Sequence, residues 1–384
     1  MKFVFYTNSV SPHQLPLAKE IIQILGDDSY RYIYTHKLSD DRKIMGWKDE
    51  LAPWIVCETD SPAKCRQMLE TCDILLSGIR DLDLFEKRAI EGRKTFYCSE
   101  RWFKPRLGVW RLFKPSYLKM SFRFVRLLQS CDSMYYLPIG AHAARDMTRL
   151  SGLMSGDIMC FFKAPDIDFD GVPCGSIRLR YGMSEERTRK YCLDKMRMWG
   201  YFVAGCTANT AKRAIHDPLR ILWCGRMLKL KNVVTLLNAT RKLVGCGFRV
   251  VVTLVGNGPD ENRLRILSKG LPVTFLPFCE NSKIRKLMRE HDVFVFPSNG
   301  IEGWGAVVNE ALLEGMRVLA SDMTGSGSVL LPKECQFNPY KVEELVAKIK
   351  GEISYTGIGE WTADVAANKI LELPSLRVKK LSRV

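Results

Sequence analysis

Two glutamates, Glu302 and Glu310, flank a glycine-broken segment that carries the most informative chemistry of this chain. The apolar run 292–297 before the segment predicts a strand, and residues 306–314 after it predict a helix. A loop in this position aims backbone N–H groups and the positive end of a helix at a ligand, which favours anions. A carboxylate is repelled by an anion, so the two glutamates favour a ligand rich in hydroxyls, as a sugar is. The alternative is an ordinary helix with an acidic first turn.

Basic residues follow an earlier predicted strand at 220–224. Gly225 permits a sharp backbone turn at the end of that strand. Arg226 then offers a planar fork of donors, and Lys231 offers a point charge. Together they suit a diphosphate, although basic loop residues are often simply solvated.

Two further strand ends carry residues that suit a ligand. After 249–255 comes Gly256-Asn257-Gly258, whose glycines permit close approach of the backbone, although a tight turn explains them equally well. After 272–277, Phe278 is placed to lie against a base and Asn281 to cap a helix. The carboxyl ends of parallel strands meet at one edge of a sheet, so we expect all these residues to gather there.

Short apolar strands alternate with helices along the whole chain, which is typical of parallel sheets built from strand-helix-strand units. The strands of the second half are nearly continuous apolar runs, so both faces of their sheet should be covered. We therefore predict an α/β fold of two doubly wound, Rossmann-like domains that face each other across a cleft. Strands are expected at 2–7, 30–34, 53–57, 73–79, 94–98, 133–137, 158–162, 220–224, 249–255, 272–277, 292–297 and 317–321, and helices at 15–25, 83–91, 232–245, 259–269, 281–290 and 306–314.

The length of 384 residues favours two domains. We expect an N-terminal acceptor-side domain at 1–205, a linker at 206–218 where periodicity is lost, and a donor-binding domain at 219–355. Residues 356–384 are expected to form a helix that returns to the first domain, followed by a basic tail.

Composition excludes a membrane-spanning protein and a disulfide scaffold. Hydrophobic residues make up 46% and charged residues 26%, and no apolar run is long enough to cross a bilayer. The thirteen cysteines are scattered, with no Cys-x-x-Cys motif, which indicates a reducing cytoplasm. No Asp-x-Asp motif lies at a suitable strand end, because Asp166-Ile167-Asp168, the one such spacing of note, is expected to lie in a loop.

The net charge is +16, and the basic residues are unevenly distributed along the chain. Residues 101–131 hold eight basic residues, no acidic ones and seven aromatics. This mixture suits an anionic membrane surface, and it would also suit single-stranded nucleic acid or a helix that packs its aromatics inward. The residues expected to face the membrane or the acceptor are Trp102, Arg106, Trp110, Arg111 and Lys114.

Considered as a set, these motifs resemble the donor-binding domain of glycosyltransferase family four. The motifs that carry the resemblance are Gly225-Arg226 with Lys231, Gly256-Asn257-Gly258-Pro259, Phe296-Pro297-Ser298, Glu302-Gly303-Trp304-Gly305 with Asn309-Glu310-Ala311, and Gly315 to Asp322. They run in order from about 220 to 335 with suitable spacing. More loosely, segments 11–16 and 97–101 resemble members that build bacterial surface polysaccharides.

The resemblance implies a retaining enzyme of the GT-B fold that uses a nucleotide-diphosphate sugar, with no cofactor and no metal. It implies that Arg226 and Lys231 hold the diphosphate, that Glu310 binds the ribose, and that Glu302 contacts the transferred sugar. On this account the donor phosphate takes the acceptor proton, so neither glutamate is a nucleophile. The implied donor-binding set is Gly225, Gly256, Asn257, Gly258, Phe278, Gly303, Trp304, Gly305, Ala306, Val307 and Glu310.

The first half departs from the family pattern, because residues 8–12 stand where many members carry a glycine pair. His13 and Glu100 are predicted to assist catalysis from the acceptor side, and His142 is a weaker candidate.

We therefore expect a glycosyltransferase of polysaccharide or glycolipid biosynthesis, acting on a glycan or lipid-linked glycan at the cytoplasmic face of the membrane. The alternatives are a sugar-nucleotide epimerase or phosphorylase on the same fold. A nucleic-acid-binding protein leaves the paired glutamates unexplained, so nucleic acid is not an expected partner.

Overall fold

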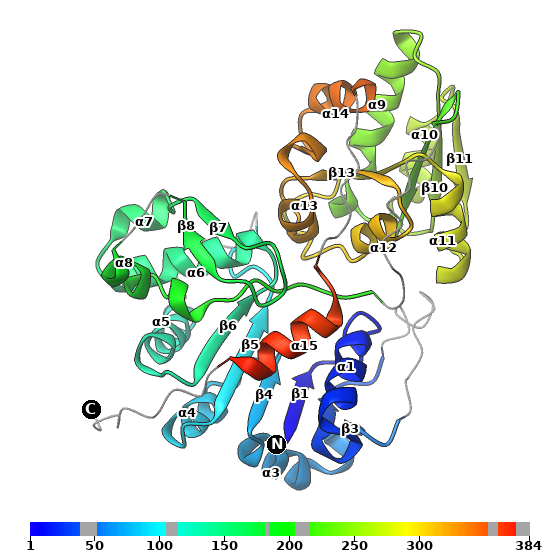
Figure 1. The fold of residues 1–384 in the computed structure, drawn as a ribbon. Helices are drawn as coiled ribbons and strands as arrows, with labels where there is room; N and C mark the ends of the chain where they lie inside the picture. Colours follow the sequence, from blue (N-terminus) through cyan, green and yellow to red (C-terminus); the bar gives the residue numbers. More distant parts are fainter. Residues whose placement is uncertain (39–51, 105–113, 181–183, 204–214, 352–359, 374–384) are drawn as a thin grey trace. The chain divides into compact units, whose positions relative to one another are not determined.

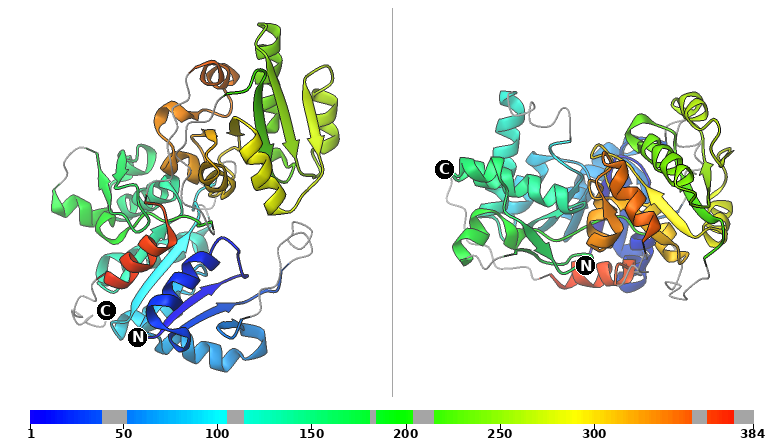
Figure 2. Two further views of the ribbon diagram at one scale, coloured as in Figure 1. Left: turned by 45° about the vertical axis from the view of Figure 1, so that its right-hand side comes forward. Right: turned by 90° about the horizontal axis from the view of Figure 1, so that it is seen from above.

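The computed structural model describes residues 1–38, 52–104, 114–180, 184–203, 215–351 and 360–373 (Figure 1, Figure 2). Backbone contacts divide the chain into two compact units. Unit 1 comprises Met1–Phe202 and Glu360–Val384, and unit 2 comprises Val203–Gly359. Most of the linker expected at 206–218 lies outside the described residues.

Unit 1 is built on a six-stranded parallel sheet in the order β3-β2-β1-β4-β5-β6. The order reverses between β1 and β4, which is the doubly wound arrangement. The strands are β1 (Phe3–Thr7), β2 (Tyr30–Tyr34), β3 (Ile55–Cys57), β4 (Ile74–Ser77), β5 (Lys94–Ser99) and β6 (Met134–Pro138). Most of their side chains are buried, because helices cover both faces of a parallel sheet.

The helices of unit 1 are α1 (Leu15–Leu25), α3 (Pro62–Thr71), α4 (Leu82–Ile90), α5 (Pro115–Ser130), α6 (Ala141–Met154), α7 (Ile158–Phe162), α8 (Glu185–Lys190) and α15 (Ala363–Glu372). Short 3-10 turns lie at Asp27–Ser29, Glu58–Asp60 and Leu193–Lys195. The C-terminal helix α15 packs against α1, so the chain returns to unit 1 at its end (Figure 1).

Unit 2 repeats the doubly wound arrangement with the order β11-β10-β9-β12-β13-β14. Its strands are β9 (Leu219–Cys224), β10 (Val250–Val255), β11 (Val273–Leu276), β12 (Val293–Phe296), β13 (Arg317–Ser321) and β14 (Gln336–Phe337). Its helices are α9 (Val233–Gly245), α10 (Glu261–Leu267), α11 (Asn281–Glu290), α12 (Val307–Leu313), α13 (Gly325–Leu330) and α14 (Val342–Lys350), with 3-10 turns at Lys229–Lys231 and Lys333–Cys335. The prediction of an α/β fold with two doubly wound domains is confirmed.

One predicted strand is wrong, because residues 158–162 form the short helix α7. The Asp157 carboxylate accepts a hydrogen bond of 3.0 Å from the backbone N–H of Cys160 and so caps the helix. A short apolar run does not distinguish a strand from a helix by itself. The prediction of a loop at Asp166-Ile167-Asp168 is also wrong in part. Ile167 and Asp168 belong to β7 (Ile167–Phe169), which pairs with β8 (Ile177–Leu179) in an antiparallel ladder.

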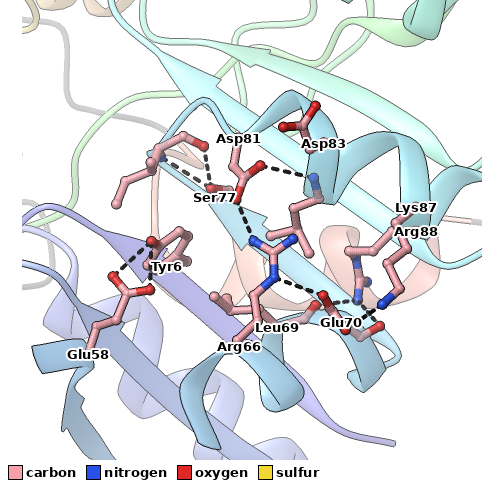
Figure 3. Close-up of polar contacts among 12 residues, drawn as sticks. Tyr6, Glu58, Arg66, Leu69, Glu70, Ser77, Asp81, Asp83, Lys87 and Arg88 are labelled. Atoms are coloured by element: carbon pink, nitrogen blue, oxygen red, sulfur yellow. Dashed lines mark hydrogen bonds and ion pairs between the residues drawn. The ribbon is translucent and has the colours of Figure 1, made fainter. Parts of the chain in front are cut away.

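A buried arginine, Arg88, holds α4 against α3 and β5 in unit 1, and Figure 3 shows it beside Leu69 of α3. Its side chain is fully buried. The guanidinium donates to the carbonyl oxygens of Leu69 at 2.8 Å, Cys72 at 2.9 Å and Lys94 at 2.8 Å. It also donates to the Thr95 hydroxyl at 2.9 Å. The charge is tolerated because each of these donors has an acceptor.

We expect Arg88→Met to lower the free energy of unfolding by roughly 3 kcal/mol or more, because several buried carbonyls lose their donor at once. The matched control is Lys87→Met on the same helix, whose side chain is 50% exposed in its bridge to Glu70. This control should cost about 1 kcal/mol or less. Urea unfolding followed by circular dichroism measures both variants, and equal losses would contradict the structural role of Arg88.

Candidate active site

The candidate site lies where the strand order of unit 2 reverses, between β9 and β12. The loops that follow the central strands are joined by backbone hydrogen bonds. The N–H of Met227 donates to the Asn257 carbonyl at 2.7 Å, and the N–H of Asn299 donates to the Leu230 carbonyl at 2.9 Å. The loops after β9, β10 and β12 therefore form one connected rim at the carboxyl edge of the sheet.

Two of the predicted glycines are required by contacts within this rim. Gly256 has φ +128°, and a Cβ there would lie 2.1 Å from the Gly225 carbonyl oxygen. Gly258 has φ +153°, and a Cβ there would lie 2.5 Å from the Met227 carbonyl oxygen. The structure thus gives these glycines a packing role. Their approach to a ligand stays a prediction, as does that of the partly exposed Arg226 and Phe278 at the ends of β9 and β11.

The loop between β12 and α12 is fixed by several contacts. Gly305 has φ +86°, and a Cβ there would lie 2.4 Å from the Phe296 ring. The Trp304 indole is buried and donates to the Asn309 side chain at 2.8 Å. The carbonyl of Trp304 accepts from the backbone and hydroxyl of Ser326 at 3.0 and 2.7 Å. Trp304 therefore anchors the loop through its side chain, and the 303–307 backbone is held in a fixed conformation.

An ion pair joins Lys231 to Glu302, with 2.5 Å between Nζ and Oε2. Both side chains are largely buried, at 18% and 14% exposed. Asn232, in the left-handed region at φ 51°, places the lysine by donating to the carbonyls of Pro297 at 3.2 Å and Pro339 at 2.8 Å. The sequence analysis assigned Lys231 to the donor diphosphate and Glu302 to the transferred sugar, and it did not predict a contact between them.

Glu310 lies on α12 and is 8% exposed. The Asn281 amide donates to its Oε1 at 2.9 Å. Burial raises the pKa of the Glu310 carboxyl, and the hydrogen bond from Asn281 opposes that rise. Asn281 was expected to cap the next helix, but Glu280 holds the cap position and the Asn281 side chain supports Glu310 instead. The sequence analysis did not include Asn281 among the site residues, because its partner Glu310 lies 29 positions further along the chain.

Comparisons with known proteins identify a family and a fold that this chain resembles. Residues 207–353 match the family described as glycosyl transferases group 1. The chain also superimposes on the HepE protein of Anabaena, solved in complex with UDP, with a TM-score of 0.56 and 17% identity, covering 97% of this chain and 94% of that one. The galactosyltransferase WaaB of the lipopolysaccharide outer core gives a TM-score of 0.56 and 13% identity, covering 97% of this chain and 95% of that one.

The fold is that of the GT-B glycosyltransferases. Curated relatives include a phosphatidyl-myo-inositol mannosyltransferase of Mycobacterium leprae, 34% identical over 102 residues, or 26% of this chain. The amylovoran biosynthesis glycosyltransferase AmsK of Erwinia amylovora is 30% identical over 121 residues, or 29% of this chain. The matches span 27% and 30% of these relatives' lengths. They support a place in the glycosyltransferase superfamily.

In unit 1 of this GT-B protein, His13 and Glu100 follow β1 and β5 at the carboxyl edge of the sheet. Burial lowers the pKa of His13 to about 4, so its ring is neutral at pH 7. Glu100 pairs with Lys104 at 2.8 Å. His142 lies in the first turn of α6. In the sheet β4 separates β1 from β5, and the acceptor-side roles of these residues stay predictions.

The prediction that Trp102 faces the membrane or the acceptor is wrong. Its side chain is 1% exposed and stacks on Phe124 at a centroid distance of 5.5 Å. Its indole donates to the Tyr136 hydroxyl at 3.1 Å, and the Arg80 guanidinium lies 3.8 Å from the ring centroid. Lys114 is exposed, whereas Arg106, Trp110 and Arg111 lie outside the described residues. Within the described ranges, no helix combines the length and the apolarity needed to span a bilayer.

The raised pKa of Glu310 predicts a pH-dependent cost in stability. Glu310 has its ordinary pKa in the unfolded state and a higher pKa in the folded state. At pH values between these two pKa values the folded state binds more protons than the unfolded state, so the free energy of unfolding falls as pH rises through that range. We expect Glu310→Gln to stabilise the protein at neutral pH by about 1 kcal/mol, the usual gain from relieving a costly functional group. The gain should vanish below the ordinary glutamate pKa of about 4.3.

Denaturant unfolding at neutral and acidic pH measures this difference. Glu290→Gln, at the half-exposed end of α11, is the matched control and should change stability by about 0.5 kcal/mol or less at either pH. A Glu310→Gln protein that is less stable than the wild type at neutral pH would contradict the assignment.

Proposed function

We propose that this protein is a retaining, metal-independent glycosyltransferase of family four that moves a sugar from a nucleotide-diphosphate sugar to a growing, lipid-linked glycan. The observation that carries the proposal is the Lys231–Glu302 ion pair at the carboxyl edge of the sheet of unit 2, together with the buried Glu310 of α12 that the Asn281 amide supports. Lys231, in the loop after β9, is a cation that suits a diphosphate. Glu302 and Glu310, in the segment after β12, are carboxylates that suit hydroxyls.

The ion pair suggests how the donor enters. The donor diphosphate competes with Glu302 for the Lys231 ammonium, because both are anions. Once Lys231 turns to the diphosphate, the Glu302 carboxylate has acceptor capacity for hydroxyls of the transferred sugar. Arg226 adds a second cation, with a planar fork that matches phosphate oxygens. Glu310, held by Asn281, accepts hydrogen bonds from the nucleotide ribose.

In the transfer step, the bond from the anomeric carbon to the diphosphate oxygen breaks and its electron pair leaves with the diphosphate. The acceptor hydroxyl oxygen bonds to that carbon from the same face, and its proton passes to a donor phosphate oxygen. Arg226 and Lys231 stabilise the charge that grows on the leaving diphosphate. They fill the electrostatic role that a divalent cation has in other phosphate-binding enzymes, and neither glutamate forms a covalent intermediate.

Similar proteins support the choice of substrates. The HepE structure holds UDP, and further structures of that protein hold UDP with glucose and UDP-glucose, which supports a nucleotide-sugar donor. The named mannosyltransferase, amylovoran enzyme and lipopolysaccharide galactosyltransferase support a role in glycolipid or polysaccharide biosynthesis. We place the enzyme on the anionic cytoplasmic face of the membrane, with His13 and Glu100 on the acceptor side.

Removing the site's charged groups tests the proposal. We expect Lys231→Ala, Arg226→Ala and Glu302→Gln each to lower kcat by roughly 100-fold or more, because each loses an interaction that grows in the transition state. Lys229→Ala is the matched control, since this exposed lysine lies on the same 3-10 turn and should leave kcat nearly unchanged. Nucleoside-diphosphate release is the assay, after a thermal-shift screen of nucleotide diphosphates and their sugars selects the base. Full activity of Glu302→Gln and Lys231→Ala together would refute the assignment.

The product and its stereochemistry test the finer parts of the proposal. We expect the anomeric configuration of the donor to be kept in the glycoside, as read by proton NMR, and the rate to be unchanged by EDTA. An inverted product would refute the retaining mechanism, and loss of activity in EDTA would refute metal independence. An isomerised donor indicates an epimerase, and a requirement for inorganic phosphate indicates a phosphorylase.

A further inference from the structure

The short helix α7 of unit 1 carries large apolar side chains on the protein surface. Ile158 is 60% exposed, Met159 is 70% exposed and Phe162 is 73% exposed. Positions 158 and 162 are one helical turn apart, so these side chains share one side of the helix. The other large exposed apolar residues of the described ranges are scattered singly along the sequence, which is ordinary for a soluble surface. A cluster of three needs a separate explanation.

The opposite side of α7 is firmly seated, so the exposed cluster belongs to ordered structure. Cys160 is buried against Gly152 of α6, where an added Cβ would lie 2.7 Å from its sulfur. The Phe161 ring packs against Phe103 with 6.0 Å between centroids. Asp157 caps the helix and accepts a hydrogen bond of 2.5 Å from the Tyr191 hydroxyl. The fold thus presents the apolar side chains outward on a helix whose other side is packed against unit 1.

Basic side chains lie beside this apolar cluster. Lys163 directly follows Phe162 and is exposed. The Tyr191–Asp157 hydrogen bond brings the last turn of α8, with Arg187 and Lys190, next to the start of α7 (Figure 1).

Three of the acidic groups near α7 and on α8 are engaged with partners, and Glu186 in the first turn of α8 is exposed. Asp157 accepts from Tyr191, Asp166 lies 3.8 Å from Arg145, and Glu185 pairs with Arg189 at 2.9 Å. Basic residues therefore outnumber acidic ones on α8, with Arg187, Arg189 and Lys190 against Glu185 and Glu186.

The basic surface continues onto α5. The Gln129 amide of α5 donates to the Lys190 carbonyl of α8 at 3.1 Å, so the two helices are neighbours. Helix α5 has no acidic residue, and its Lys119 and Arg126 are exposed. An apolar tip surrounded by basic residues is the arrangement that binds an anionic bilayer, with the apolar groups below the headgroups and the cations among them.

We propose that α7 is a membrane-docking element, which inserts Ile158, Met159 and Phe162 into an anionic bilayer while Lys163, Lys190 and the α5 cations contact its headgroups. The inference deepens the proposed function and rests on its lipid-linked acceptor. It moves the membrane contact away from Trp102, whose side chain is buried in the core of unit 1.

Vesicle flotation of the full-length protein tests the proposal without donor or acceptor. Phosphatidylcholine vesicles with phosphatidylglycerol should bind the wild type, and phosphatidylcholine alone should bind it much less. The affinity of the triple variant Ile158→Ser, Met159→Ser, Phe162→Ser for the anionic vesicles should be roughly tenfold lower or more, because three apolar side chains no longer insert. Lys163→Glu with Lys190→Glu should also weaken binding.

Matched controls separate this effect from a general loss of surface apolarity or charge. Ile90→Ser and Ile266→Ser remove residues that are 70% and 64% exposed elsewhere, and both should bind vesicles as the wild type does. Lys286→Glu, at a side chain 71% exposed on α11, is the control for charge. A nucleoside-diphosphate thermal shift that is unchanged in the triple variant shows that unit 2 is intact, so this test is independent of the transfer assay.

Three outcomes would overturn the proposal. The first is vesicle binding by the triple variant that equals that of the wild type. The second is a wild type that does not bind anionic vesicles. The third is a wild-type dimer in sedimentation analysis that the triple variant converts to monomer with vesicle binding unchanged, which would make a second copy the occupant of α7.

Discussion

The position of β9 between β10 and β12 is the constraint on which the candidate site depends. Because the strand order reverses there, the loops that follow β9 and β12 lie next to each other at the sheet edge, and the groups they carry meet there. Lys231 reaches this place from the first loop and Glu302 from the second, although 71 positions separate them in sequence. The glycines at 256 and 258 matter for the same reason, since they let the loop after β10 lie directly against the loop after β9.

The electrostatics of the site follow from this crowding. A lysine that is 18% exposed loses much of its hydration, and Glu302 supplies a compensating charge. Glu310 has no such cation in direct contact among the described interactions, and its support is the neutral Asn281 amide. The two glutamates therefore differ in kind. One is already paired with a lysine, whereas the other is a buried carboxylate with a raised pKa. Sites of this kind are retained for function rather than for stability.

Much of the fold could be predicted from the sequence, because strands of a parallel sheet are continuous apolar runs that helices separate. The strands at 219–224 and 317–321 were found for this reason. The side-chain partners could not be predicted in the same way. The contacts of Asn281 with Glu310 and of Lys231 with Glu302 join residues far apart in sequence, so they depend on register and loop path rather than on local pattern. A helix cap was the reasonable local prediction for Asn281, and tertiary structure overrode it.

The membrane question shows why composition and burial must be read together. The interleaved basic and aromatic residues of 101–131 suit a membrane surface and an inward-packed helix equally well, and only burial separates the two readings for Trp102 and Phe124. The reverse holds for α7. Its apolar run resembles a buried strand, and a buried strand would carry no information about a partner. Once Asp157 caps the run as a helix and Cys160 faces inward, three apolar side chains are left in water. Leaving them exposed is unfavourable in an isolated soluble protein, and an anionic bilayer is a partner that both the apolar tip and its basic neighbours favour.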